Sequence, residues 1–196
     1  MKESDNNSQL PEDENKLVAL RREKLHAIRQ KREAYPNGFQ RKSTAKELIS
    51  DYGGKGKAEL EELVIETSVA GRIIRIRGPF LVIVDGGVKI QLYLNSKMLS
   101  DELLDEFKLL DLGDIIGVEG VVFKTNKGEL TVRISTFQLL TKSLRPLPDK
   151  HKGLIDTELR YRQRYLDLLV NEDSRSIFEM RSEIIKFIRS YENNKK

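Results

Sequence analysis

Apolar and polar residues follow a helical spacing near the start of the chain. Between residues 13 and 34 the apolar positions recur at intervals that predict an amphipathic helix. These positions are Leu17, Leu20, Leu25 and Ile28. Acidic residues lie near the start of this segment and basic residues near its end, where both complement the helix dipole, and Pro36 and Gly38 end it. The preceding residues 1–12 are polar and are expected to be disordered.

A two-residue alternation then replaces the helical spacing. In residues 88–94 apolar residues alternate with Lys89, Gln91 and Tyr93, a pattern that is typical of a half-buried strand. Residues 95–110 return to a helical spacing. The five predicted strands are residues 64–78, 79–87, 88–94, 114–125 and 128–142.

The order of these elements, three strands, one helix and two strands, predicts how the sheet closes. Five short antiparallel strands leave exposed edges unless the sheet curls into a barrel, and a helix between the third and fourth strands covers one end of such a barrel. This is the arrangement of the OB fold. We therefore predict a β-rich α+β protein with a five-stranded OB-fold barrel, an N-terminal helical extension and a C-terminal helical connector.

Shorter helical patterns lie on either side of the barrel. Residues 43–50 indicate a short helix, and the glycine-rich residues 51–60 indicate a connection, because they lack the Gly-Lys-Ser/Thr ending of a phosphate loop. After a proline-containing linker, residues 156–170 form a predicted helix. A second helix from about residue 174 carries an apolar stripe with no following segment to cover it. The stripe consists of Ile177, Met180 or Arg181, Ile184, Ile185 and Ile188. The predicted divisions are a tail at 1–12, a helical extension at 13–62, the barrel at 63–142, and a linker with the helical connector at 143–196.

The composition excludes several classes of site. The chain has no cysteine, which excludes disulfides and thiolate metal sites. Its two histidines, His26 and His151, lie far apart and have no partner at ligand spacing, so we expect no metal site. No apolar run approaches the roughly 18 residues of a membrane span, and the first residues lack the apolar core of a signal peptide. We therefore expect a cytoplasmic protein that has no contact with a membrane.

Positive charge is concentrated in and after the first predicted helix. Residues 16–42 hold nine lysines and arginines against two glutamates. Like charges at this density repel one another unless an anionic partner neutralises them, which favours contact with a nucleic-acid backbone. A solvated helix face is the other explanation. The candidate backbone contacts are Arg21, Arg22, Arg29 and Lys31.

The predicted barrel face also carries candidate binding residues. OB barrels bind oligonucleotides or oligosaccharides across their second and third strands. Phe80 offers a ring that can stack on a base, and the amide of Gln91 can pair with a base edge. Phe80 shares strand parity with Val82 and Val84, so the pattern leaves open whether its ring stacks on a base or lies in the core. Glu129 follows a turn, and a solvated carboxylate is its simpler explanation. Arginines near the end of the first strand add positive charge: Arg72, Arg75 and Arg77.

Several strings resemble those of bacterial class II lysyl-tRNA synthetases. They are VAGRIIRIRG followed by a Phe, GGVKIQLYL, DLGDIIGVEGVVFKTNKGEL, LLTKSLRPLPDKHKGL and ELRYRQRYLDLLVN. The similarity covers about residues 13 to 191, and TKSLRPLP and RYRQRYLDL favour the lysine enzyme over its aspartate and asparagine relatives. The resemblance implies that the N-terminal helix and the barrel bind the anticodon arm of lysine tRNA, tRNA(Lys), whose anticodon bases are mostly uridines.

The resemblance also implies roles for individual residues. The family's stacking phenylalanine corresponds to Phe80, its base-reading glutamine to Gln91 and its turn glutamate to Glu129. Arg72 matches the arginine of the first strand. Arg77 matches more loosely, because the segment between Arg72 and Phe80 is shorter than is common in the family.

The C-terminal residues resemble the start of a catalytic domain. In the family RYRQRYLDL, residues 160–168 here, lies between barrel and catalytic domain near the dimer interface, and the next helix begins motif 1. This favours a packing helix over a tRNA contact, and it indicates association as a homodimer or heterodimer through residues 154–191. Motifs 2 and 3, which hold ATP, lysine and magnesium in the full-length family, are absent from the sequence. We therefore expect tRNA(Lys) binding without aminoacylation, and no cofactor on this chain.

Two alternatives stay open at this point. The 196 residues can be part of a complete, active lysine–tRNA ligase, or they can form an OB-fold protein that binds single-stranded nucleic acid in general. Lysine-dependent exchange between ATP and pyrophosphate separates the first alternative from our prediction. A series of anticodon substitutions separates the second.

Overall fold

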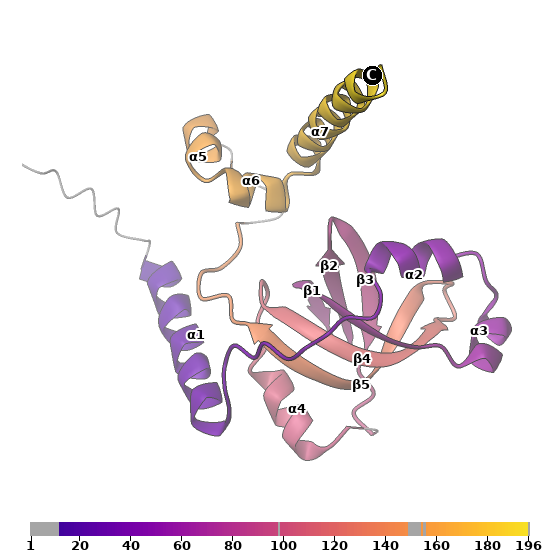
Figure 1. Cartoon of the computed structure of the whole chain (residues 1–196). Coiled ribbons are helices and arrows are strands. Elements are labelled where there is room, and N and C mark those ends of the chain that lie inside the picture. The colour runs from indigo at the N-terminus through magenta and orange to yellow at the C-terminus, as the bar shows by residue number, and fades with distance from the viewer. Residues whose placement is uncertain (1–11, 98, 149–153, 155, 196) are drawn as a thin grey trace, which may run out of the picture. The chain divides into compact units, whose positions relative to one another are not determined.

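The computed structural model describes residues 12–97, 99–148, 154 and 156–195 (Figure 1). The chain divides into two compact units, residues 1–146 and 147–196, and each is described by itself. The predicted disordered tail lies outside the described residues except for residue 12, which begins a helix. No helix within the described ranges is long and apolar enough to cross a membrane.

Five strands form a closed barrel in the order β1-β2-β3-β5-β4, which confirms the predicted OB fold. Neighbouring strands are antiparallel except for β3 and β5, which pair in parallel over a short stretch from Gln91 to Tyr93. The pairing of β1 with β4 closes the ring. The strands are β1 (Glu66–Arg77), β2 (Phe80–Asp85), β3 (Val88–Tyr93), β4 (Ile115–Lys124) and β5 (Leu130–Thr141).

The barrel curves where its strands are irregular or closely packed. The register of β1 against β2 shifts between Ile73 and Arg75, and that of β4 against β5 shifts between Glu119 and Gly120. Such bulges increase local twist and allow a small sheet to close. At the second bulge, a Cβ atom on Gly120 would lie 2.0 Å from the main-chain oxygen of Arg133, so only glycine fits there.

Strand alternation sorts the side chains between the barrel interior and its outer face. On β3, Ile90 and Leu92 are buried in the core, whereas Lys89, Gln91 and Tyr93 point outward as predicted. On β2 the interior positions are Leu81 and Ile83, both fully buried. Their neighbours Phe80, Val82 and Val84 therefore lie on the outer face, because successive side chains of a strand alternate.

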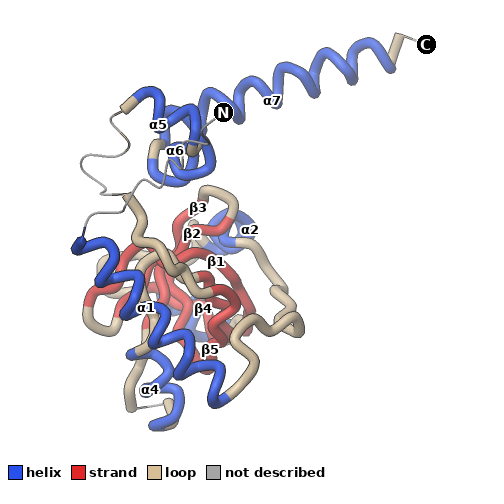
Figure 2. The backbone as a smooth tube through the Cα atoms, turned by 90° about the vertical axis from the view of Figure 1, so that its left-hand side faces the viewer, coloured by secondary structure: helices blue, strands red, loops and turns tan. Residues whose placement is uncertain are grey.

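Helix α1 (Glu12–Lys31) packs through a face that differs in part from the predicted stripe. Leu17 and Leu20, two of the four apolar positions of the predicted amphipathic helix, are 47% and 48% exposed and therefore do not belong to its buried face. Arg21 is buried in their place, because main-chain carbonyl groups bind its guanidinium group. The buried residues of α1 are Val18, Arg21, Leu25 and Ile28. Figure 2 shows α1 beside the barrel and α4, and just after α1 Arg32 forms a bidentate ion pair with Glu106 of α4.

Three shorter helices complete the first unit. Helix α2 (Ala45–Tyr52) begins at a capping box formed by Thr44 and Glu47, close to the predicted short helix. Helix α3 (Lys57–Leu63) lies where the sequence indicated only a connection, and its fully buried Leu60 explains its formation. Helix α4 (Asp101–Lys108) is shorter than predicted because Ser100 caps its start. Its apolar residues Leu103, Leu104 and Phe107 pack on the barrel core.

Among its described residues, the second unit contains three helices where the sequence predicted two. Gln163, with φ −115° and ψ 52°, interrupts the predicted helix and divides it into α5 (Thr157–Arg162) and α6 (Arg164–Val170). Helix α7 (Glu172–Asn193) follows, and Asn171 caps it. The predicted apolar stripe of α7 is exposed along its length.

Candidate nucleic-acid interface

A groove of about 700 Å³ lies on the outer barrel surface. One side comes from the turn between β1 and β2 and the start of β2, and the other from the turn between β4 and β5. Gln91 contributes from β3. The lining residues are Arg75, Arg77, Gly78, Pro79, Phe80, Val82, Gln91, Thr125, Asn126, Lys127 and Glu129. Four predicted site residues, Phe80, Gln91, Arg77 and Glu129, are thus brought together from three separate parts of the barrel.

The ring of Phe80 is partly exposed in the groove and held from the side by other aromatic residues. Phe80 pairs with Tyr93 across β2 and β3, and their ring centroids are 5.1 Å apart. Tyr93 in turn forms a T-shaped pair with Phe123, with ring centroids 6.0 Å apart, and the guanidinium carbon of Arg133 lies 4.9 Å from the Phe123 centroid. Because the barrel interior is filled by Leu81 and its neighbours, Phe80 does not belong to the core.

The amide of Gln91 is fixed at one end. Gln91 pairs with Val82 of β2 and Thr131 of β5, and the hydroxyl group of Thr131 donates a hydrogen bond of 2.9 Å to its Oε1 atom. Within the part of the chain that the structure describes, no hydrogen bond is recorded for Nε2 of Gln91. Both Phe80 and Gln91 are partly exposed, so neither is sealed beneath other side chains.

The charged residues of the groove are basic on balance. Arg75, Arg77 and Lys127 line it against a single carboxylate, that of Glu129. Arg72, the other predicted arginine of β1, does not line the groove. Its guanidinium group donates a hydrogen bond of 2.7 Å to the main-chain oxygen of Gly113, which holds the loop before β4 against β1.

Sequence reasoning missed the residues that support the turn between β4 and β5. Lys57 of α3 donates a hydrogen bond of 2.9 Å to Oδ1 of Asn126. Lys124 donates to the main-chain oxygens of Gly53 and Lys55, at 2.8 and 2.6 Å. The glycine-rich segment therefore serves as a support for this turn. No local pattern indicates these contacts, because the partners lie about 70 positions apart.

The four predicted backbone contacts of α1 differ in their surroundings. Arg22, Arg29 and Lys31 are exposed. Arg21 is only 8% exposed, and its guanidinium group donates to the main-chain oxygens of Ser143 and Arg145, at 2.8 and 3.1 Å. We therefore remove Arg21 from the candidate RNA contacts and assign it a structural role.

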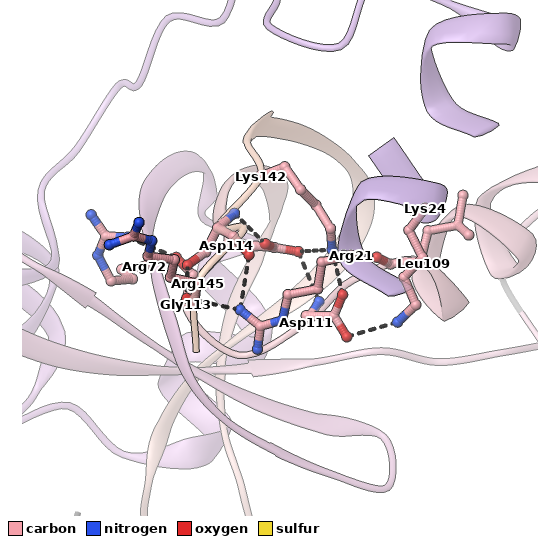
Figure 3. A network of polar contacts seen from close by, with 10 residues as sticks. Arg21, Lys24, Arg72, Leu109, Asp111, Gly113, Asp114, Lys142 and Arg145 are labelled. Carbon is pink, nitrogen blue, oxygen red and sulfur yellow. Dashed lines mark hydrogen bonds and ion pairs between the residues drawn. The ribbon is translucent and has the colours of Figure 1, made fainter. Parts of the chain in front are cut away.

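A buried ionic network holds α1, the loop before β4 and the end of β5 together (Figure 3). The ammonium group of Lys142 donates to Leu109 O, Asp111 Oδ2 and Asp114 Oδ2, at 2.7, 2.6 and 2.7 Å. Lys24 donates to the other oxygen of Asp111 at 2.7 Å. Burial is the largest influence on Asp111 and raises its pKa, but the hydrogen bonds from Lys142 and Lys24 outweigh it and lower the pKa below the ordinary value.

The arginines of RYRQRYLDL are bound within the second unit. The carboxylate of Asp167 is 1% exposed and accepts hydrogen bonds from Arg160 at 2.9 Å and from Arg164 at 2.5 Å. Arg164 also lies over the rings of Tyr161 and Phe178. Burial is the largest influence on Asp167 and raises its pKa. The hydrogen bonds from Ser174 and the two arginines together outweigh burial, so the pKa lies below its ordinary value. This geometry favours the predicted packing helix over a tRNA contact.

Among the described residues, no group of three or more histidines and carboxylates lies where it could hold a metal ion.

The closed barrel and its basic, partly aromatic groove define the class of this protein. Residues 67–140 match the tRNA_anti-codon family, described as an OB-fold nucleic acid binding domain. Over these residues the barrel of this chain is thus similar to OB-fold nucleic acid binding domains.

The particular relatives are lysine–tRNA ligases, and the chain is a homologue of part of them. It is 57% identical over 183 residues to the Lysine--tRNA ligase of Neisseria meningitidis serogroup A, a match that covers 91% of this chain and 36% of that protein. It is 54% identical over 182 residues to that of Pseudomonas savastanoi pv. phaseolicola, covering 93% and 36%, and 52% identical over 184 residues to that of Pseudomonas aeruginosa strain LESB58, covering 93% and 37%. The chain thus spans little more than a third of the length of these relatives.

Proposed function

We propose that this chain binds the anticodon of tRNA(Lys) in the groove between β2, β3 and the turn between β4 and β5. The observation that carries the proposal is the meeting of Phe80 and Gln91 in one partly exposed groove, in a chain homologous to lysine–tRNA ligases. Phe80 supplies a ring for a base to stack on. Gln91 supplies an amide that pairs with the edge of a base.

The surroundings of both residues suit that role. The contact with Tyr93 fixes the plane of the Phe80 ring before RNA arrives, which lowers the entropy that binding costs. Arg75, Arg77 and Lys127 offer positive charge to the phosphates on either side of the bound bases. In this proposal, Glu129 lies at the groove margin as a carboxylate that accepts hydrogen bonds from a base, and Arg72 supports the fold beside the groove.

We extend the proposal to the exposed basic residues of α1. Arg22, Arg29 and Lys31 contact the phosphate backbone of the anticodon arm, and such contacts strengthen binding without choosing among base sequences. They therefore act differently from Phe80 and Gln91. Their contribution falls with rising salt concentration, because each phosphate contact releases a counterion.

The same proposal holds that these 196 residues do not aminoacylate tRNA. Amino-acid activation needs cations aimed at the transferring phosphates and a pocket for the amino acid. The described residues form a barrel with short helices and a three-helix unit, and the matches cover 36% of the relatives' length. ATP and magnesium belong to the full-length family in this view. Purified chain is expected to show no lysine-dependent exchange between ATP and pyrophosphate, and any such exchange assigns it enzyme activity.

A partner for the second unit is also part of the proposal. The apolar residues of α7 lie on its surface, and burying them would favour a homodimer or a heterodimer through residues 154–191. The exposed residues include Ile177, Met180, Ile184, Phe187 and Ile188. Sedimentation of the purified chain over a range of concentrations tests self-association, and a purely monomeric profile restricts the proposal to a heterodimer.

An anticodon substitution titration tests the central claim. RNA stem–loops with the anticodon UUU are compared with stem–loops in which cytidine or adenosine replaces each uridine. We expect the UUU stem–loop to bind most tightly. Equal affinity for all of them would instead support the second candidate, a general single-strand binder in which backbone electrostatics supplies the affinity.

Two variants and one matched control assign the effect to the groove. Phe80→Ala and Gln91→Ala are each expected to weaken UUU binding by about 1 to 3 kcal/mol, the magnitude of one stacked or edge-paired base. Val84→Ala is the control, because Val84 lies on the same strand and face as Phe80 but outside the groove. A loss of the same size in Val84→Ala would attribute the effect to the strand and not to the groove.

A further inference from the structure

Thr131 is a threonine on the outer barrel face that is nevertheless fully buried. It pairs with Gln91 of β3 on one side and with Phe123 of β4 on the other. Directly paired residues of a sheet point to the same face, so the three side chains form one row on the outside of the barrel. The side chain of Thr131 therefore lies between Gln91, which lines the groove, and Phe123, and it is out of contact with solvent.

The hydroxyl group of Thr131 has two acceptors within reach. Oε1 of Gln91 lies 2.9 Å away and the main-chain oxygen of Glu129 lies 3.1 Å away. A hydroxyl group carries one proton and donates it to one acceptor at a time. The shorter contact goes to Gln91. Thr131 thus donates its one proton to the amide oxygen of Gln91, and the main-chain oxygen of Glu129 is the more distant, competing acceptor.

This contact decides which end of the Gln91 amide faces the groove. An amide has an acceptor end, its oxygen, and a donor end, its NH₂ group. Because Thr131 binds the oxygen, the NH₂ group is the end available to a ligand. Uracil has an oxygen acceptor at C4 of its pairing edge, where cytosine has an amino donor. An NH₂ group fixed in this orientation bonds to the first base and opposes the second.

We infer that Thr131 is a positioning residue that selects uracil over cytosine, because its buried hydroxyl group orients the amide of Gln91. The inference rests on the proposed anticodon binding. The inference assigns a role in base selection to Thr131, a residue that itself makes no contact with the RNA. The alternative role, a β-branched residue that only fills a strand position, needs the methyl group of threonine and not its hydroxyl group.

The test compares Thr131→Val with Thr131→Ser in the purified full chain. Valine keeps the shape and removes the hydroxyl group, whereas serine keeps the hydroxyl group. Affinities are measured for the UUU stem–loop and for stem–loops with cytidine at one anticodon position at a time. We expect Thr131→Val to reduce the preference for uridine about tenfold at one position, the discrimination that one edge contact provides. Thr131→Ser is expected to retain it.

Two further variants separate a positioning role from a structural one. Thr136→Val makes the same chemical change on the same strand at an exposed position outside the groove, and it should leave the preference unchanged. The double variant Gln91→Ala with Thr131→Val should lose no more discrimination than Gln91→Ala alone, because Thr131 acts through Gln91. Should Thr131→Val unfold at the assay temperature, Thr131→Ala replaces it, and thermal melting of each variant accompanies the titration.

The outcomes distinguish this inference from the function on which it depends. If the unaltered chain binds uridine and cytidine stem–loops equally, anticodon recognition itself is refuted. If the unaltered chain prefers uridine and Thr131→Val or its replacement keeps that preference in full, anticodon recognition stands and the role of Thr131 is refuted. A reduced preference that Thr131→Ser does not share supports the inference.

Discussion

Replacing Lys142 with methionine tests the buried network that fixes α1 to the barrel. The side chains of Lys142 and Asp114 are both 0% exposed. All three hydrogens of the ammonium group are used, on Leu109 O, Asp111 and Asp114. Methionine fills a similar volume but donates nothing, so the buried carboxylate of Asp114 loses its ion-pair partner.

The expected loss of stability follows from what still holds Asp114. Breaking a buried ion pair by removing one partner costs about 3 to 5 kcal/mol. Here the main-chain NH groups of Asp111 and Ser143 still donate to Asp114, at 2.7 and 2.8 Å. Asp111 also keeps its bond from Lys24. We therefore expect a loss of about 3 kcal/mol, at the lower end of that range.

Urea unfolding at neutral pH measures this loss. Because the chain has two units, NMR signals of buried barrel methyl groups follow the first unit separately. Adding Asp114→Asn to Lys142→Met should restore part of the stability, since the amide removes the uncompensated charge. Lys108→Met is the control, because Lys108 forms an ion pair with Asp105 in which both side chains are mostly exposed, and no measurable change is expected. A loss below about 1 kcal/mol in Lys142→Met would refute the reasoning, because only an exposed pair contributes so little.

Three other predictions concern pH, backbone strain and salt. The pKa values of Asp111 and Asp167 are lowered in the folded chain, so their contribution to stability is present above the unfolded pKa of about 4 and is lost as pH falls through the folded values. Acid titration followed by circular dichroism should show stability declining only below about pH 4. A decline that starts near pH 6 would contradict this assignment. Val64 is 58% exposed with φ 43°, a left-handed conformation that strains a β-branched residue. Val64→Gly should therefore stabilise the first unit by up to about 1 kcal/mol in urea unfolding, whereas Leu63→Gly at the end of α3 should destabilise it. Stabilisation by both variants would point to a cause other than backbone strain. Alanine at all three exposed basic positions of α1 should make RNA binding less dependent on salt and leave base preference intact. The slope of log affinity against log salt concentration should fall by up to about 3 in magnitude, and an unchanged slope would exclude phosphate contact. These positions are Arg22, Arg29 and Lys31.

The sequence was sufficient for the barrel because strand alternation is a local property. Whether Ile90 or Gln91 faces the core depends only on strand parity, and the polar residues of β3 had to lie outside. The same rule places Phe80 outside once β2 is seen to bury Leu81 and Ile83. From the sequence alone its parity with Val82 and Val84 was ambiguous, because both faces of that strand are apolar.

The tertiary structure decided what depends on partners distant in the chain. Arg21 was predicted to contact RNA, yet it is buried because carbonyl groups of Ser143 and Arg145 bind it. Helix α3 forms because the side chain of Leu60 is fully buried, although the glycines that precede the helix indicate a loop. In both cases a contact with residues far along the chain outweighs the local propensity, and no local pattern records such a contact.

The candidate site divides in the same way. Residue types and the resemblance to a family identify Phe80, Gln91, Arg77 and Glu129 from the sequence. Their meeting in one groove, and the buried hydroxyl group of Thr131 behind Gln91, depend on the closure of β3 against β5, which brings residues 91 and 131 side by side. On β3 the sequence alone thus determined which side chains face outward, because strand parity is local. Only the closed barrel decided which of them are neighbours, because pairing between strands is a property of the whole sheet.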